Sequence, residues 1–119
     1  MGTVSNEREG LVLNLKTDVP RIILGTMNFG GQVDEHAADQ MLTMFLDLGY
    51  NEIDTAYTYT NGASEEILGR ILTPERRGKA YLATKANPLG GGGLGPEGIV
   101  KQVNTSLRRF KTDYVDRLF

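Results

Sequence analysis

Short apolar segments alternate with longer amphipathic segments along most of this chain. An apolar, β-branched run at 21–24 is typical of a buried strand. Apolar side chains then recur at helical spacing after Asp34, which is suited to cap a helix, and Gly49 is suited to end it. Ser64 can cap a second helix, and Pro74 is expected to end it. The pattern predicts strands at 21–24, 51–54 and 80–84 and a fourth strand that opens at 113–116, with helices at 34–48, 65–72 and 96–111.

Strands and helices that alternate in this way predict a parallel sheet with right-handed connections. Two architectures stay open at this point, an open doubly wound sheet and a part of a (β/α)8 barrel. A whole barrel needs roughly 250 residues, so the 119 residues of this chain amount to about half of one. Residues 1–19 are polar and mixed, and we expect an N-terminal arm there. The alternation of Leu11, Leu13 and Leu15 permits a short strand in that arm.

Composition and charge exclude several classes of protein. Lys and Arg number 13 and Asp and Glu number 15, and this net charge of −2 does not suit a nucleic-acid partner. The absence of cysteine excludes thiolate metal sites and a cysteine nucleophile, and we expect no bound metal. No apolar run can span a membrane and no secretory signal is apparent, so we expect a cytoplasmic globular domain without a membrane partner. The basic residues at 76–79 and 108–109 are expected on solvated faces.

Three side chains with complementary chemistry are expected at one edge of the sheet. Asp54 and Lys85 each stand where a predicted strand ends, and Tyr59 follows Asp54 in the next loop. The carboxyl ends of parallel strands lie together, and neighbouring strands are about 4.8 Å apart. Because an ammonium beside a phenol favours the phenolate, this trio can give a proton to a carbonyl oxygen. The alternative is an Asp54–Lys85 pair that only ties two strands together, with Tyr59 as a loop aromatic.

Several separated segments resemble the aldo-keto reductases. Residues 49–59 are similar to the first signature of that family, and residues 64–69 continue it. Residues 24–27, 83–88 and 112–116 resemble the aflatoxin-aldehyde reductase branch in particular, so the resemblance covers about residues 20–116 in consistent order. It implies the N-terminal half, about the first four strands, of a (β/α)8 TIM barrel. It also implies an oxidoreductase that reduces small-molecule aldehydes or ketones to alcohols with NADPH.

The resemblance assigns catalytic roles to the same three side chains. Tyr59 matches the catalytic acid of the family and Lys85 matches the residue that lets this acid ionise more readily. Asp54 matches their partner and is implied to lie within reach of the cofactor.

The resemblance also implies residues that face the ligands. Gly25, Thr26 and Met27 match the segment near the nicotinamide end of the cofactor. Tyr57 either lines the substrate pocket together with Tyr59 or serves in packing. The glycines at 90–93 are expected in a flexible loop near the substrate mouth. Which carbonyl compound is reduced, and whether NADPH or NADH is used, stays open.

The end of the chain departs from the family pattern. The family has a catalytic histidine at the end of the fourth strand, and in this chain that strand is cut at Arg117, Leu118 and Phe119, a few residues short of the histidine position. We therefore expect residues 20–119 to be a partial barrel, truncated within the fourth strand, and inactive as an isolated fragment. Two exposed sheet edges then permit self-association. The alternative function is a non-catalytic interaction module, like the potassium-channel β subunits or a homodimer of two half-barrels.

Overall fold

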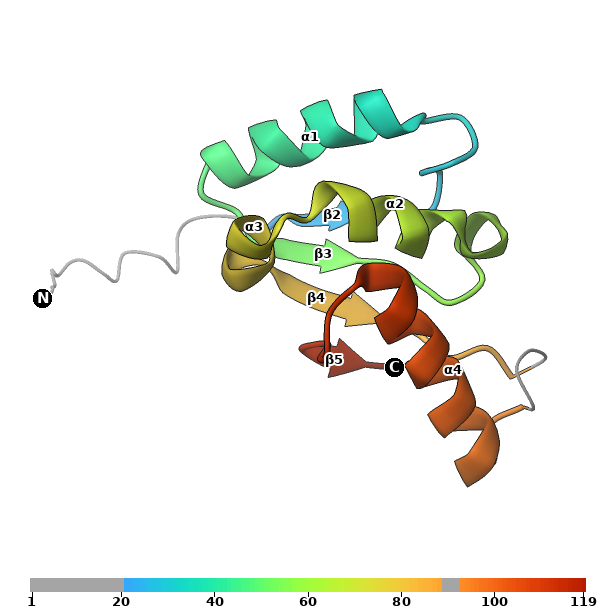
Figure 1. Cartoon of the computed structure of the whole chain (residues 1–119). Helices are drawn as coiled ribbons and strands as arrows, with labels where there is room; N and C mark the ends of the chain where they lie inside the picture. Colours follow the sequence, from blue (N-terminus) through green and yellow to red (C-terminus); the bar gives the residue numbers. More distant parts are fainter. Residues whose placement is uncertain (1–20, 89–92) are drawn as a thin grey trace, which may run out of the picture.

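A computed structural model describes residues 21–88 and 93–119 (Figure 1). The expected N-terminal arm at 1–19, with its permitted strand, and most of the expected glycine loop at 90–93 lie outside the described residues. In chain order the elements are β2 (Ile23–Gly25), α1 (Glu35–Asp47), β3 (Glu52–Asp54), the 3-10 helix η2 (Tyr59–Gly62), α2 (Ala63–Ile71), α3 (Pro74–Lys79), β4 (Tyr81–Thr84), α4 (Pro96–Phe110) and β5 (Arg117–Leu118). The predicted alternation of strands and helices is confirmed, with η2 and α3 in addition.

The four strands form one parallel sheet in the order β2-β3-β4-β5. Each strand is added on the same side of the one before it, whereas a doubly wound sheet reverses direction partway. Helices α1, α2 and α4 all lie on one face of the sheet (Figure 1). This arrangement is that of half a (β/α)8 barrel, and it decides between the two architectures that the hydrophobic pattern left open.

The helix-covered face of the sheet carries the apolar core. Ile53 and Leu82 are paired in register at the centre of β3 and β4 and are almost completely buried. Side chains from α1, α2 and α4 pack with them: Ala38, Leu42, Phe45, Ile67, Leu68, Ile71 and Phe110. On the opposite face, Ile23 and Tyr81 are 46% and 37% exposed. The sheet therefore buries one face and leaves the other open.

Ser64 does not cap α2 as the sequence predicted. Gly62 occupies the cap position in a left-handed conformation (φ 95°) and offers no side chain to the helix. Ser64 is instead fully buried, and its Oγ lies 2.8 Å from Thr26 Oγ1 and 2.9 Å from Thr55 Oγ1. The hydroxyl group therefore joins the start of α2 to the segments that follow β2 and β3.

Two further boundaries differ from those predicted. Pro74 does not end a helix but begins α3, where a residue without a backbone N–H is tolerated. The fourth strand is confined to β5 (Arg117–Leu118) and does not include residues 113–116. The Asp116 side chain explains this difference. Its carboxylate accepts the N–H of Leu82 at 2.7 Å, in place of a backbone carbonyl of the neighbouring strand.

Arg77 is buried, contrary to the expectation of a solvated face at 76–79. Its side chain donates to Ala80 O at 3.1 Å and to Tyr114 O at 2.8 Å, and it pairs with Asp116 at 3.2 Å. The guanidinium also lies 4.0 Å from the centre of the Tyr114 ring. Arg77 therefore ties α3 to the segment that leads into β5.

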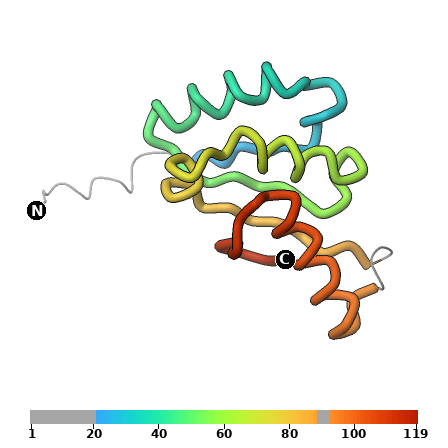
Figure 2. Tube along the Cα trace, viewed as in Figure 1, coloured from blue at the N-terminus to red at the C-terminus, as the bar shows by residue number. Residues whose placement is uncertain are grey.

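Helix α2 passes very close to the end of α4 (Figure 2). A Cβ atom added to Gly69 would overlap the backbone carbonyl of Arg109. The absence of a side chain at this one position allows the two backbones to approach.

We expect Gly69→Ala to lower the free energy of unfolding by roughly 1–3 kcal/mol, because α2 and α4 must separate to admit the methyl group. Urea denaturation of the purified chain measures the change. Gly78→Ala in α3 is the matched control, since nothing lies within 4 Å of a Cβ at that position. There we expect a gain of roughly 0.5–1 kcal/mol from helix propensity. Equal effects of the two substitutions would contradict the close approach.

Candidate active site

Asp54 and Lys85 form an ion pair at the carboxyl ends of β3 and β4. Asp54 is the last residue of β3, and Lys85 directly follows β4. Lys85 Nζ lies 2.9 and 2.8 Å from the two carboxylate oxygens of Asp54 and 3.0 Å from Thr55 O. The parallel register pairs Asp54 with Ala83, which points to the same face as Lys85. Both charged side chains are about one-third exposed, at 33% and 32%.

Tyr59 completes this cluster. Lys85 Nζ donates a hydrogen bond to Tyr59 Oη at 3.2 Å and lies 5.0 Å from the centre of the ring. The chain before Tyr59 is held against β4, because Tyr57 N donates to Lys85 O at 3.0 Å. The chain after it is held against the segment that follows β2, where Thr60 Oγ1 donates to Met27 O at 3.1 Å. The structure thus brings together the carboxylate, the ammonium and the phenol that the sequence placed at one sheet edge.

Lys85 keeps its charge in this setting. Burial lowers the pKa of Lys85, but its hydrogen bonds to Asp54 and Tyr59 and their negative charge outweigh burial and raise the pKa above its ordinary value. The ammonium therefore persists at a higher pH than that of a free lysine. A cation stands beside the phenol oxygen throughout the neutral range.

The segment expected near the nicotinamide surrounds a small cavity. Gly25, Met27, Asp54 and Tyr59 line a cavity of about 270 Å³, below the roughly 300–1,000 Å³ of ordinary ligand pockets. Space beside Gly25 is open, and Met27 is 62% exposed. Thr26 also lines the cavity but is fully buried: its hydroxyl and its backbone N–H both donate to Asp54 O, at 3.0 and 3.2 Å, and its carbonyl accepts from Phe29 N and Ser64 Oγ. The cavity can take one ring of a dinucleotide and not the whole molecule.

The carbonyl and the ring of Tyr57 are contacted by Arg109 of α4. Arg109 Nη1 donates to Tyr57 O at 2.7 Å, and the guanidinium carbon lies 4.6 Å from the centre of the Tyr57 ring. This contact is the packing role that the sequence left open for Tyr57. Its role toward a substrate stays a prediction.

Sequence reasoning missed a buried carboxylate next to the site. Glu65 is fully buried and accepts hydrogen bonds from Thr84 Oγ1 at 2.6 Å, Ser106 Oγ at 2.9 Å and Arg109 Nη1 at 2.9 Å. The side chain of Arg109, expected on a solvated face, is 18% exposed. A signal for this cluster was present in α4, where Gln102, Ser106 and Arg109 stand at helical spacing on the inward face.

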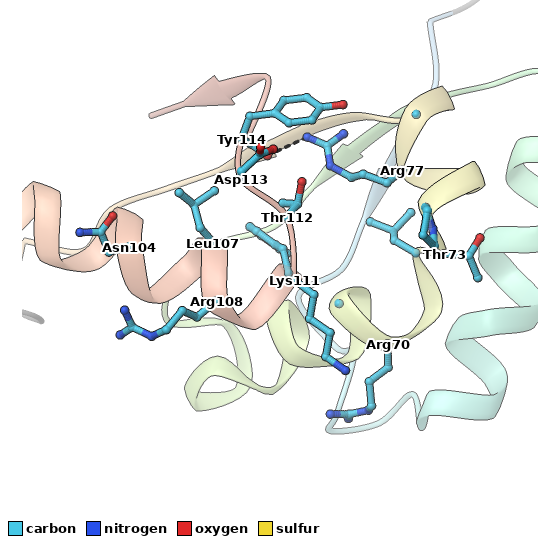
Figure 3. Close-up of a pocket in the computed structure, with 15 residues that line it drawn as sticks. Arg70, Thr73, Arg77, Asn104, Leu107, Arg108, Lys111, Thr112, Asp113 and Tyr114 are labelled. Carbon is cyan, nitrogen blue, oxygen red and sulfur yellow. Dashed lines mark hydrogen bonds between the residues drawn. The ribbon is translucent and has the colours of Figure 1, made fainter.

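A larger hollow lies at the opposite end of the sheet (Figure 3). It is a groove of about 1010 Å³ between α2, α3, the end of α4 and the segment before β5. Arg77 and Tyr114 meet at one side of it, while Arg70, Arg108 and Lys111 extend outward at its rim. The groove adjoins the amino ends of β4 and β5. It therefore lies apart from the cluster of Asp54, Lys85 and Tyr59 at the carboxyl ends of β3 and β4.

Two kinds of feature are absent from residues 21–88 and 93–119. No group of three or more His, Asp or Glu side chains in these ranges is placed to hold a metal ion. None of the helices described there is both long enough and apolar enough to cross a membrane.

Comparisons with known proteins agree with this geometry. A family model described as the Aldo/keto reductase family matches residues 21–119. The chain is 39% identical over 102 residues to aflatoxin B1 aldehyde reductase member 2 of Rattus norvegicus, a match that covers 84% of this chain and 28% of the rat protein. The Homo sapiens protein of the same name is 38% identical over 104 residues, with 84% and 29% covered. The chain therefore belongs to the aldo/keto reductase family.

Solved structures of the family share the fold. An aldo-keto reductase from Bacillus halodurans in its holo form matches with a TM-score of 0.69 and 34% identity, covering 82% of this chain and 34% of that one. An aldo-keto reductase from Klebsiella pneumoniae in complex with NADPH matches with a TM-score of 0.65 and 32% identity, covering 84% and 34%. The chain spans about a third of the length of these relatives. The predicted fold class, the N-terminal part of a TIM barrel, is confirmed.

The raised pKa of Lys85 predicts how the ion pair stabilises the fold as pH changes. The stabilisation is complete below the pKa of lysine in the unfolded chain, about 10.4, and is lost as pH rises through the higher folded value. Because both partners are one-third exposed, Lys85→Met should lower the free energy of unfolding at pH 8 by no more than about 1 kcal/mol.

Urea denaturation of wild type and Lys85→Met between pH 8 and pH 11 measures this effect. The difference between the two proteins should shrink above pH 10.5, the ordinary pKa of lysine. Lys79→Met is the control, since Lys79 is 68% exposed and lies 3.9 Å from Glu75. A difference for Lys85→Met that grows with pH would contradict the direction of the shift.

Proposed function

We propose that this chain carries the proton donor of an aldo-keto reductase that reduces an aldehyde or ketone to an alcohol with NADPH. The observation that supports this most is Lys85 Nζ, which joins both carboxylate oxygens of Asp54 to Tyr59 Oη. Membership of the family supports the reaction class. The names of the similar proteins, aflatoxin B1 aldehyde reductases, support an aldehyde as the carbonyl substrate.

In this proposal Tyr59 is the general acid. Its Oη gives its proton to the carbonyl oxygen of the substrate while the carbonyl carbon accepts a hydride. The Lys85 ammonium, 3.2 Å away, stabilises the negative charge that remains on the phenol oxygen. Both carboxylate oxygens of Asp54 accept hydrogen bonds from that ammonium and so keep it in place. The nicotinamide cofactor, when bound, supplies the hydride.

The residues around the 270 Å³ cavity suit the nicotinamide end of this cofactor. Gly25 and Met27 offer an open surface and Asp54 a carboxylate, all beside Tyr59, and Thr26 forms part of the cavity wall. Tyr57 would line the adjoining substrate pocket together with Tyr59. The similar reductase from Klebsiella pneumoniae, in complex with NADPH, supports this choice of cofactor.

We expect activity to require more of the barrel than these 119 residues. Within residues 21–88 and 93–119 the sheet ends at β2 on one side and at β5 on the other, and one face stays open to solvent. A reductase needs a closed site that excludes water and holds the whole cofactor. The isolated chain should therefore show no NADPH turnover.

A second candidate function is association without catalysis, as an interaction module or a homodimer of two half-barrels. The parallel sheet has open edges at β2 and β5, and Ile23 and Phe119 are 46% and 61% exposed. Such edges and apolar groups favour pairing with a second chain. Sedimentation equilibrium of the purified chain decides this point, because a stable dimer without turnover favours association and a monomer removes it.

The proposed acid is tested in a completed barrel. The chain is joined to the part of the rat aflatoxin B1 aldehyde reductase member 2 that follows its match to this chain. NADPH oxidation with an aromatic aldehyde is followed by absorbance. We expect turnover in the joined protein and a loss of roughly 10²–10⁴-fold in kcat for Tyr59→Phe, because the proton donor is removed.

Tyr114→Phe is the matched control, since Tyr114 lies beside Arg77 at the opposite end of the sheet. Its kcat should equal that of the unsubstituted protein. Full activity of Tyr59→Phe in a folded, active barrel would refute the proposed role of Tyr59.

A further inference from the structure

A second ion pair lies behind the Asp54–Lys85 pair and has no part in the proton transfer described above. Glu65, in the first turn of α2, is fully buried, and Arg109, near the end of α4, reaches it at 2.9 Å. Burying a carboxylate is unfavourable unless it is paired and hydrogen-bonded. Burying this ion pair between α2 and α4 costs free energy, and packing of the two helices alone does not require it.

Glu65 is joined to the strand that carries Lys85. Thr84 Oγ1 donates to Glu65 Oε2 at 2.6 Å, and Thr84 directly precedes Lys85. Successive side chains of a strand point to opposite faces. Thr84 therefore meets Glu65 on the helix-covered face while Lys85 meets Asp54 on the open face, and the two ion pairs stand back to back across the end of β4.

Arg109 is joined to the loop that carries Tyr59. Its Nη1 donates to Tyr57 O at 2.7 Å, and its guanidinium carbon lies 4.6 Å from the centre of the Tyr57 ring. At the other end of the loop, a Cβ on Gly62 would come within 2.7 Å of the same guanidinium carbon. One side chain thus covers both ends of the segment 57–62.

This loop has a backbone that needs such support. Thr60 and Asn61 have φ of 52° and 54°, in the left-handed region that a β-branched residue such as threonine rarely adopts. Conformations of this kind persist when the surrounding structure holds them in place. Tyr59 directly precedes the strained pair, so its position depends on what holds the loop.

We infer that Arg109 is a positioning residue, which through Glu65 and Tyr57 fixes the loop so that Tyr59 Oη meets Lys85 Nζ. Its value for catalysis rests on the proposed function of Tyr59. The geometric part does not, and it can be measured in the 119-residue chain without turnover.

The direct test is the contact between Lys85 and Tyr59 observed by NMR. Arg109→Gln removes the guanidinium that covers the loop. We expect the nuclear Overhauser effect between the Lys85 ε-methylene and the Tyr59 ring to be lost. The ¹³Cε titration of Lys85 should move to lower pH, as far as it does in Tyr59→Phe, because the hydrogen bond to Tyr59 helps to raise the pKa of Lys85.

Arg108→Gln is the matched control. Arg108 is the neighbouring residue on α4, is exposed, and donates to Thr105 Oγ1 without touching the loop. This substitution removes the same charge and should leave both signals of Lys85 unchanged. An unchanged contact and titration in folded Arg109→Gln would overturn the inference.

A second variant covers the case in which Arg109→Gln leaves Glu65 uncompensated and does not fold. The double substitution Glu65→Gln with Arg109→Met removes both charges, which a buried pair tolerates better than the loss of one partner. We expect it to fold and to lose the Lys85–Tyr59 contact. Retention of that contact in the folded double variant would equally overturn the inference.

Kinetics in the completed barrel separate positioning from a general effect on folding. Arg109→Gln should lower kcat on the order of tenfold to a hundredfold, as expected of a misplaced catalytic group, with KM for the aldehyde little changed. Arg109→Lys should restore part of kcat, because an ammonium can still bridge Glu65 and Tyr57 O. If the NMR contact is lost while kcat is unchanged, the geometric part of the inference holds and the proposed function of Tyr59 is refuted. A retained contact would refute the positioning role.

Discussion

The in-register parallel pairing of β3 with β4 is the constraint on which the rest of the structure depends. This pairing sets Asp54 opposite Ala83. The next residue of the chain on the same open face is Lys85, whose ammonium therefore meets the Asp54 carboxylate at the sheet edge. The pairing continues beyond the strands, where Tyr57 N donates to Lys85 O. The chain that leads to Tyr59 is therefore an extension of the sheet. A shift of one residue in this register would turn Lys85 to the helix-covered face and remove the cluster.

The same strand end organises polar groups on both faces of the sheet. Thr84 and Lys85 are adjacent in sequence. Thr84 donates a hydrogen bond to Glu65 on the helix-covered face, and Lys85 donates one to Asp54 on the open face. In the pair behind the sheet, Glu65 is fully buried and Arg109 is 18% exposed, and both are hydrogen-bonded to neighbouring elements, as a structural role requires. The front pair keeps about a third of each side chain exposed, as a role toward a ligand requires. The degree of burial thus distinguishes the pair proposed to position the loop from the pair proposed to take part in the reaction.

The parts of this structure that repeat along the chain could be predicted from the sequence, and the parts that rest on single distant contacts could not. Periodicity and strand spacing were sufficient to place Asp54 and Lys85 together, because regular geometry connects them. The burial of Arg77 and Arg109 was missed, since a basic residue on a helix is ordinarily solvated and its acceptors here come from remote segments. Ser64 was mistaken for a cap because its partners, hydroxyls after β2 and β3, are visible in three dimensions and not in its local sequence.

The open face of the sheet is the reason why we expect the assembled side chains of the site to be inactive in this chain alone. Water reaches the Asp54–Lys85 pair, and in water an ion pair of this geometry is weak. Further strands across that face would exclude water and strengthen every electrostatic interaction of the ammonium with its neighbours. The three side chains already stand in hydrogen-bond contact before that closure. In the proposed function, further barrel strands would supply the dielectric environment and the rest of the cofactor site, while the contacts proposed for proton transfer already lie within β3, β4 and the loop between β3 and α2.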